Sequence, residues 1–162
     1  MLAEEILNDP VAHQLNEHAP GAIVEGKLAL GELTLYIDPV HIAPVCSHLK
    51  NEQMFVRLSS VTAVDWFPAE PRFEVVYHLQ SIERNLRVRL KCRIAGERPE
   101  IDSVTSVWKG ANWYERETFD LFGIQFRGHP DLRRLLMPAD WEGHPLRKDF
   151  PVHGYKYSYQ SE

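Results

Sequence analysis

The sequence predicts an α+β fold, a two-layer α/β domain with a mixed sheet, followed by an extended and irregular C-terminal tail. Its apolar residues alternate between the helical period of 3.6 and the strand period of 2, in the order helix, two strands, helix, three strands, helix. A length of 162 residues suits one such domain. We therefore divide the chain into an α+β scaffold domain, residues 1–125, and a tail, residues 126–162.

The first half of the domain carries two helices and two short strands. Residues 2–18 have a helical stripe that Pro10 interrupts, and residues 22–27 and 33–37 are typical of strands. Asp38 and Pro39 then predict a helix start, because aspartate caps helices and proline is favoured at the first position. Pro44 predicts that the regular helix begins nearer to His41 or contains a kink.

The second half predicts three strands and a helix. Residues 54–67, with a possible bulge at Ser59-Ser60, 72–80 and 85–94 have short connections, which favours an antiparallel meander. From Ser103 to Phe122 the apolar residues return to helical spacing, and Gly123 stands where a helix end favours a left-handed residue.

The tail combines prolines with too much apolar surface for a solvated segment. The prolines at 130, 138, 145 and 151 forbid a long helix, yet leucines, Trp141 and Phe150 lie between them. We expect such a segment to wrap over another protein, because Trp, Tyr and Arg are favoured interface anchors. We also expect it to be mobile in the isolated chain, where its apolar side chains have no evident partner.

Composition argues against several classes of protein. A net charge of -5 gives nucleic acid no general attraction. Cys46 and Cys92 are too few for a disulfide framework and cannot alone ligate an iron–sulfur cluster. The acidic N-terminus lacks the features of a signal peptide, and no apolar run is long enough for a membrane span. If the chain works at a membrane, we expect another protein to hold it there.

Three patterns resemble binding sites only in part. The segment from Gly21 to Lys27 lacks the Ser or Thr of a phosphate-binding loop and favours an ordinary hairpin. One strand face carries four cations without the aromatic residues of a nucleic-acid surface, which favours a solvated face or an acidic partner: Arg87, Arg89, Lys91 and Arg93. Several histidines and carboxylates could be considered as metal ligands, but their histidines lack the close spacing that directs two imidazoles at one ion: His129, Asp131, His144 and His153, with Glu115, Glu117 and Asp120.

The charges of residues 113–123 allow two interpretations. Asp120 lies four residues after Arg116, on the same helix face and at ion-pair spacing, so the segment suits a solvated helix edge. Alternatively, these charges pair with arginines of the following segment and fix its path: Arg127, Arg133 and Arg134.

The same segment carries a family resemblance. Glu115-Arg116-Glu117, Asp120-Leu121-Phe122-Gly123 and the run from His129 to Leu136 resemble the signature of the C subunit of NADH–quinone oxidoreductase, respiratory complex I. This family includes the mitochondrial 30-kDa subunit and the J subunit of the chloroplast enzyme. Trp113 and the run from Pro145 to Pro151 extend the resemblance, which covers about residues 54–151.

The resemblance implies a non-catalytic scaffold subunit in the peripheral arm of a proton-translocating enzyme. We expect it to dock and staple the quinone-site subunits, chiefly the D subunit with the B subunit nearby, on the cytoplasmic side of the bacterial inner membrane. FMN and iron–sulfur clusters are expected in other subunits, and no catalytic, cofactor-binding or metal residue here. The signature residues would form the subunit interface: Trp113, Glu115, Arg116, Glu117, Asp120, Phe122, Gly123, His129, Pro130, Arg133, Arg134, Trp141, Leu146, Arg147 and Lys148.

Three other functions remain open. The first is the equivalent subunit of a complex-I-like membrane-bound hydrogenase, with the same scaffold role. The second is a small metal-dependent hydrolase that uses His129, Asp131 and His144. The third is a small RNA-binding module that uses the basic strand, residues 87–93.

Overall fold

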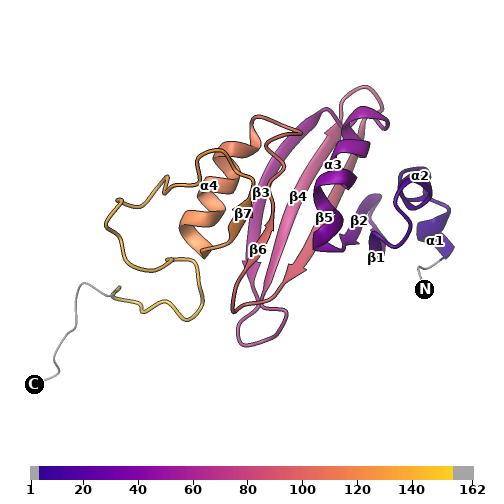
Figure 1. Cartoon of the computed structure of the whole chain (residues 1–162). Coiled ribbons are helices and arrows are strands. Elements are labelled where there is room, and N and C mark those ends of the chain that lie inside the picture. Colours follow the sequence, from indigo (N-terminus) through magenta and orange to yellow (C-terminus); the bar gives the residue numbers. More distant parts are fainter. Residues whose placement is uncertain (1–3, 155–162) are drawn as a thin grey trace, which may run out of the picture.

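A computed structural model describes residues 4–154 and confirms the α+β class with a mixed sheet (Figure 1). The last eight residues of the predicted tail lie outside the described residues. The elements are α1 (Glu4–Leu7), α2 (Pro10–His18), β1 (Ile23–Ala29), β2 (Glu32–Ile37), a 3-10 turn (Pro39–His41), α3 (Ile42–Asn51), β3 (Arg57–Asp65), β4 (Phe73–Ser81), β5 (Leu86–Ile94), β6 (Glu100–Asp102), α4 (Ala111–Phe122) and β7 (Gln125–Arg127).

The main sheet has five strands in the order β1-β2-β5-β4-β3. Strands β3, β4 and β5 form the predicted antiparallel meander, while β2 pairs with β5 in parallel, which makes the sheet mixed. The pairing of β3 with β4 skips a position between Leu58 and Ser60, so the predicted bulge is confirmed. Helix α3 follows β2 and precedes β3, so it connects the edge pair β1–β2 to the meander.

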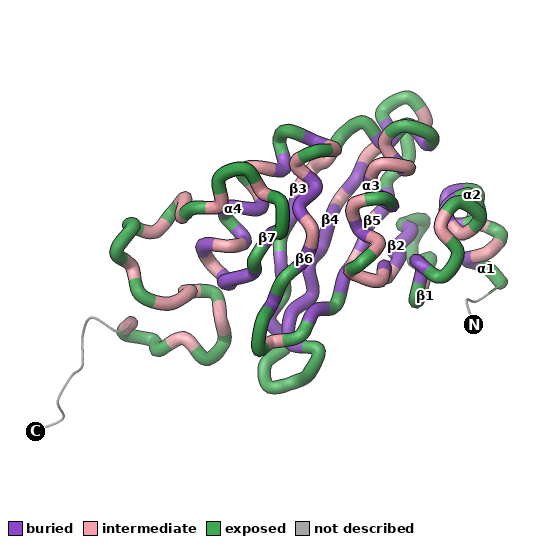
Figure 2. The backbone as a smooth tube through the Cα atoms, in the orientation of Figure 1, coloured by how far each residue is buried: buried purple, intermediate pink, exposed green. Residues whose placement is uncertain are grey.

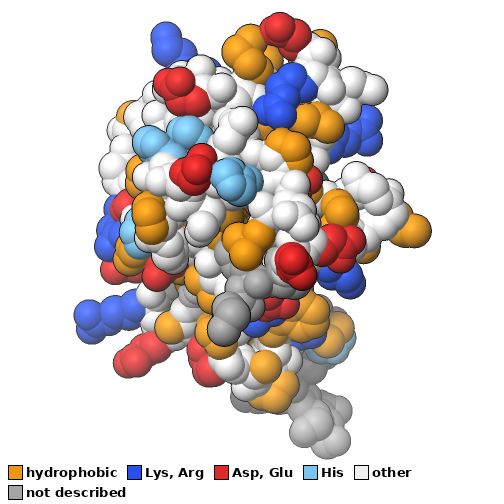
Figure 3. Space-filling view, turned by 90° about the vertical axis from the view of Figure 1, so that its right-hand side faces the viewer, with side chains coloured by type: hydrophobic (Ala, Val, Ile, Leu, Met, Phe, Trp, Pro, Cys, Tyr) orange, Lys and Arg blue, Asp and Glu red, His pale blue; other side chains and the backbone are white. Residues whose placement is uncertain are grey.

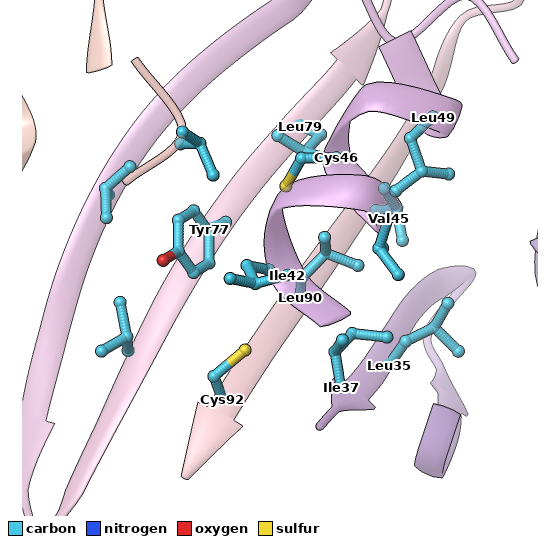
Figure 4. Packing of buried hydrophobic residues seen from close by; sticks show 14 of the residues in the cluster. Leu35, Ile37, Ile42, Val45, Cys46, Leu49, Tyr77, Leu79, Leu90 and Cys92 are labelled. Carbon is cyan, nitrogen blue, oxygen red and sulfur yellow. The ribbon is translucent and has the colours of Figure 1, made fainter. Parts of the chain in front are cut away.

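The core lies between the sheet and the helices on one of its faces. Helix α3 points its apolar stripe at strands β2, β4 and β5, as Figure 4 shows for Cys46, Tyr77 and Leu90 among others. The strands beneath are buried along most of their length, whereas the hairpin tips and the tail are mostly exposed (Figure 2). Both cysteines are buried and free, and burial raises their pKa values, so they behave as small apolar residues.

The prolines of the first half are accommodated at helix starts. Pro10 divides the predicted first helix in two and becomes the first residue of α2, where Asp9 accepts hydrogen bonds from the amides of Val11 and Ala12. Pro44 is the third residue of α3, where an amide would lack an intrahelical acceptor in any case, so α3 begins next to His41 as predicted.

The prediction of a helix from Ser103 is wrong at its start. Helix α4 begins at Ala111, and residues 103–110 form turns after the short strand β6. The amides of Val107 and Trp108 both bond the carbonyl of Val104, so a single helical turn precedes α4, which explains the helical spacing. Periodicity did not predict β6, which precedes α4 in the chain, or β7, which follows it. These two strands pair in parallel and so bring together the segments at the two ends of α4.

The other face of the main sheet has no helix over it among the described elements. Figure 1 shows α3 and α4 on one side of the strands and α1 and α2 beside the β1 edge. The surface on the α1–α2 side mixes acidic, basic and histidine side chains with scattered apolar ones (Figure 3). The predicted boundary at residue 125 falls within β7, so the irregular tail begins at Gly128.

Candidate functional site

Helix α4 has two buried sides, and each binds a different part of the chain. Towards the sheet, the Glu115 carboxylate is fully buried and accepts hydrogen bonds from the Ser103 hydroxyl at 2.6 Å and the Val104 amide at 2.7 Å. Towards the tail, the helix presents Arg116 and Asp120, which are four residues apart and buried as well. The helix therefore joins the domain to the tail.

The Asp120 carboxylate is the centre of the tail contact. One oxygen accepts hydrogen bonds from three consecutive amides, those of residues 135–137, at 2.7–2.9 Å. The other accepts one from the Arg134 guanidinium at 2.7 Å. Burial raises the pKa of Asp120, but the bonds from Met137 and Arg134 outweigh it and hold the pKa below its usual value. The charged form of Asp120 therefore fixes the turn at residues 134–137.

Two arginines complete this contact by binding backbone carbonyls. Arg134 also donates to the carbonyls of Trp141 and Gly143, so that one guanidinium joins α4 to a later part of the tail. Arg116 donates to the carbonyls of Arg133 and Arg134 at 3.1 Å, and its guanidinium lies over the Trp113 ring. Both arginines thus bind the main chain of the tail, which leaves exposed apolar side chains such as Leu136 free to point outward.

The tail also supplies donor partners for the C-terminus of α4. The carbonyl of Asp120 accepts from His144, that of Leu121 from the Leu146 amide, and that of Phe122 from Arg147. The last four carbonyls of a helix have no intrahelical donor, and cations are favoured at this end. The tail is therefore the cap of α4, and the two depend on each other.

Gly123 makes the approach of the tail possible. It ends α4 in the left-handed region, with φ of 77°, where its amide bonds the Phe119 carbonyl. A Cβ atom at this position would lie 2.6 Å from side-chain atoms of His144 and Arg147. Glycine thus suits both the backbone conformation and the space.

A second anchor fixes the end of the tail to the sheet. Arg72 donates two hydrogen bonds to Asp65, at 2.8 and 2.9 Å, and two to Asp149, at 2.6 and 3.0 Å. Asp65 also accepts from the Lys148 amide. Although burial raises the pKa of Asp65, the bonds from Arg72 and the amides of Lys148 and Phe67 lower it to about 2. A buried arginine fork therefore links β3 and β4 to the tail.

The structure brings most of the predicted interface residues to this junction but leaves some at its surface. Phe122 is buried beneath it, and Lys148 contributes its amide. His129 accepts from the Asp131 amide. Exposed residues include Glu117 and Pro130, and the large side chains of Trp113 and Leu146 are 60% and 51% exposed. Trp141 is half-buried.

The two interpretations of the charged helix are each partly wrong. The helix edge is not solvated, because Glu115, Arg116 and Asp120 are buried. Asp120 pairs with Arg134 as the second interpretation expects, but Arg127 pairs with Asp102 within the β6–β7 pair, and Arg133 pairs with Asp131. Glu115 binds the segment before the helix instead of the tail.

The second anchor was missed by sequence reasoning. Asp65 and Arg72 are seven residues apart at the two ends of the β3–β4 connection, but Asp149 lies 77 positions after Arg72. The only signal was the resemblance, which included the strand that contains Asp65 and the run that contains Asp149. Within residues 4–154, no group of three or more His, Cys, Asp or Glu side chains is placed to hold a metal ion.

Comparison with known proteins identifies the family. The model of the family described as respiratory-chain NADH dehydrogenase, 30 Kd subunit, matches residues 35–156, which includes the anchors and most of the tail. The chain belongs to this family. Relatives include the C subunit of the NADH-quinone oxidoreductase of Azorhizobium caulinodans, 49% identical over 94% of this chain and 72% of that protein. That of a Roseiflexus species is 46% identical over 90% of this chain and 84% of that protein.

Two solved structures share the fold. A trypsin-resistant fragment of Nqo5 is 32% identical with a TM-score of 0.62, over 66% of this chain and 88% of the fragment. A chain of the membrane-bound sulfane sulfur reductase, an archaeal respiratory membrane complex, is 28% identical with a TM-score of 0.75, over 94% of this chain and 93% of that one. The fold therefore occurs in more than one kind of respiratory complex.

Proposed function

We propose that the chain is a non-catalytic scaffold subunit in the peripheral arm of a proton-translocating NADH–quinone oxidoreductase. It docks beside the D subunit, with the B subunit nearby, and its tail staples these quinone-site subunits together. FMN and the iron–sulfur clusters belong to other subunits. The complex holds the chain at the cytoplasmic side of the bacterial inner membrane. No helix within residues 4–154 is both long and apolar enough to cross a membrane.

One observation carries the proposal: the tail is fixed by its main chain and turns large apolar side chains outward. Asp120 binds amides of the tail, Arg116 binds its carbonyls, and Arg72 binds one of its carboxylates. Leu136 and Leu146 are nevertheless 56% and 51% exposed. Exposed apolar groups on a fixed backbone are pre-organised for a partner, since little conformational entropy is lost on binding.

The test is assembly in the cell. A tag at the N-terminus, gentle solubilisation of membranes and mass spectrometry should recover the D and B subunits together with NADH–quinone reductase activity. Leu136→Asp with Leu146→Asp should lower their recovery, because two charges would be placed in an apolar interface. Val40→Asp is the matched control, since Val40 is 62% exposed outside the tail. A tagged chain that purifies alone, with its tail intact, would refute the scaffold role.

The equivalent subunit of a different complex-I-like membrane enzyme is the second candidate. The similarity to a chain of an archaeal respiratory membrane complex favours it. The same purification separates the two: a hydrogenase-type large subunit keeps its nickel-binding cysteines, and a quinone-reducing one does not. The role of the tail would be unchanged.

A further inference from the structure

The open face of the sheet differs in charge from the rest of the chain. Pairing registers place six cations and three carboxylates on this face: Lys27, Arg57, Arg87, Arg89, Lys91 and Arg93 against Glu25, Glu32 and Glu74. Six minus three gives a net charge of +3, on a chain whose total is -5. Such an asymmetry is typical of a surface that meets an acidic partner.

Half of these cations are already bound within the sheet. Glu74 pairs with Lys91 at 2.7 Å and with Arg93 at 3.5 Å, and both cations lie over the Tyr36 ring. Arg89 bonds His78, Thr34 and Glu32 across the strands. These three cations therefore already have their partners within the sheet.

Arg57 and Arg87 are different. They lie on either side of Gln80, in register across β3, β4 and β5, and both are exposed. Within the described part of the chain, neither guanidinium has a hydrogen bond or an ion pair. They line a hollow of about 380 Å³ at this end of the sheet. Arg87 also lines a second hollow of about 490 Å³.

The second hollow adds an apolar rim. Leu28 and Leu86, which are 37% and 38% exposed, line it on the helix-covered face of the sheet, next to Asp9 and Val11 of the α2 region. Both hollows share Glu32, Leu33 and Arg87, so they meet across the end of the sheet where β2 and β5 begin side by side.

Leu30 at the tip of the β1–β2 hairpin has no structural reason to be leucine. Leu30 and Gly31 are the two central residues of the turn, with φ of 53° and 76°. This turn favours asparagine followed by glycine, because both residues are left-handed. The Leu30 side chain is fully exposed and packs on nothing within the described residues. A branched apolar residue in a left-handed position at full exposure indicates a contact outside the chain.

We propose that this end of the sheet binds an acidic, partly apolar segment of a neighbouring subunit of the same complex. Its carboxylates bridge Arg57 and Arg87, and its apolar side chains contact Leu30 and the rim. The proposal rests on the proposed function, since it requires an assembled complex. It adds a second docking surface around the end of the sheet at Arg57, the opposite end of β3 from Asp65, where the tail is anchored.

The test is a photoreactive residue at position 87 in the tagged chain, within the purified complex. The expected product is a cross-link to a peptide of another subunit that contains at least two Asp or Glu and a large apolar residue. A cross-link to a basic peptide, to lipid alone, or no cross-link in a complex that contains the D and B subunits would overturn this inference. A wild-type chain that recovers neither of them would instead refute the proposed function.

Charge reversal gives an independent readout. Arg57→Glu with Arg87→Glu should reduce recovery of the complex about tenfold, most strongly at low salt. Arg98→Glu with Lys109→Glu is the charge-matched control, because both of these residues are exposed elsewhere and unpaired within residues 4–154. Leu30→Asn should leave the melting temperature of the isolated chain unchanged or higher and still weaken assembly. Full recovery of the complex both with Arg57→Glu and Arg87→Glu together and with Leu30→Asn would contradict the docking surface.

Discussion

The core beneath α3 and the junction of α4 with the tail are held together by different forces. Under α3, the sheet and helix exclude water with aliphatic and aromatic side chains, and the energy scales with buried area (Figure 4). At the junction, buried charges bind amides, carbonyls and each other. Apolar packing tolerates changes that keep volume, whereas a buried polar contact fails when one partner is lost. The difference explains why the tail can be fixed while its apolar residues face outward.

Asp120→Asn should have the largest effect. It removes the charge that binds Arg134 and three amides, and the loss of one partner of a buried pair costs about 4 kcal/mol. Because the tail is held mainly here, trypsin should cut after Arg133 and Arg134 far faster in the variant than in the wild type. Asp140→Asn, an exposed aspartate in the tail, is the control. Equally fast cutting of wild type and variant would show that the tail is mobile despite its anchors.

Leu90→Ala should act on the other region. Leu90 is fully buried under α3, so the cavity should destabilise the fold by about 3 kcal/mol. The whole domain should melt at a lower temperature in a single transition, because the core is shared by all five strands. Trypsin cleavage of the tail below the transition should stay as slow as in the wild type. Selective release of the tail by this variant would erase the contrast between the two regions.

Glu115→Gln should reveal that Glu115 makes the stability depend on pH with a sign opposite to that of Asp65 and Asp120. Burial raises the pKa of Glu115 from 4.5 to about 7, against the bonds from Ser103 and Val104. A raised carboxyl pKa stabilises the fold below pH 4.5, and that contribution is lost as pH rises through 7. Relative to that of the wild type, the free energy of unfolding of the variant should rise by roughly 2–3 kcal/mol between about pH 4.5 and 7.5.

Denaturant titrations at several pH values measure this gain. Asp65 and Asp120 have lowered pKa values, so their contributions are present at neutral pH and are lost as pH falls. They are common to both proteins and cancel in the difference. A difference that does not change with pH would mean that Glu115 titrates as an ordinary carboxyl.

Gly123→Ala should have the smallest effect on stability and a local one on the tail. A non-glycine residue in the left-handed region costs about 1 kcal/mol. The added methyl group would also displace His144 and Arg147, which cap α4. Hydrogen exchange should increase at the Leu146 amide and remain unchanged in the core strands. An unchanged exchange rate at Leu146 would show that the close approach of the tail is unimportant.

The sequence was most informative where structure follows periodicity. The alternation of apolar residues in β4 and β5 predicted the meander, and Asp38-Pro39 predicted a helix start that the structure places within a few residues. The helix from Ser103 failed because one isolated turn has the same spacing as a longer helix. Local pattern cannot separate the two.

The site was less predictable, because its contacts join residues that are distant in sequence. Arg116 and Asp120 have ion-pair spacing, yet each binds the tail, since buried backbone groups there also need partners. The bonds of Arg72 to Asp149 span 77 positions, which no periodicity encodes. Only the resemblance marked these segments, without saying which residues touch.

The most direct test of the scaffold role is oxidative footprinting of Trp113, Leu136 and Leu146 in the free chain and in the assembled complex. If the tail is fixed on its own domain, and the tail and α4 present these side chains to neighbouring subunits, all three should be reactive in the free chain and protected in the complex. Control side chains such as Val40 should react equally in both. Equal reactivity of the three in both states would contradict the scaffold role, because the outward face of the tail would then have no partner.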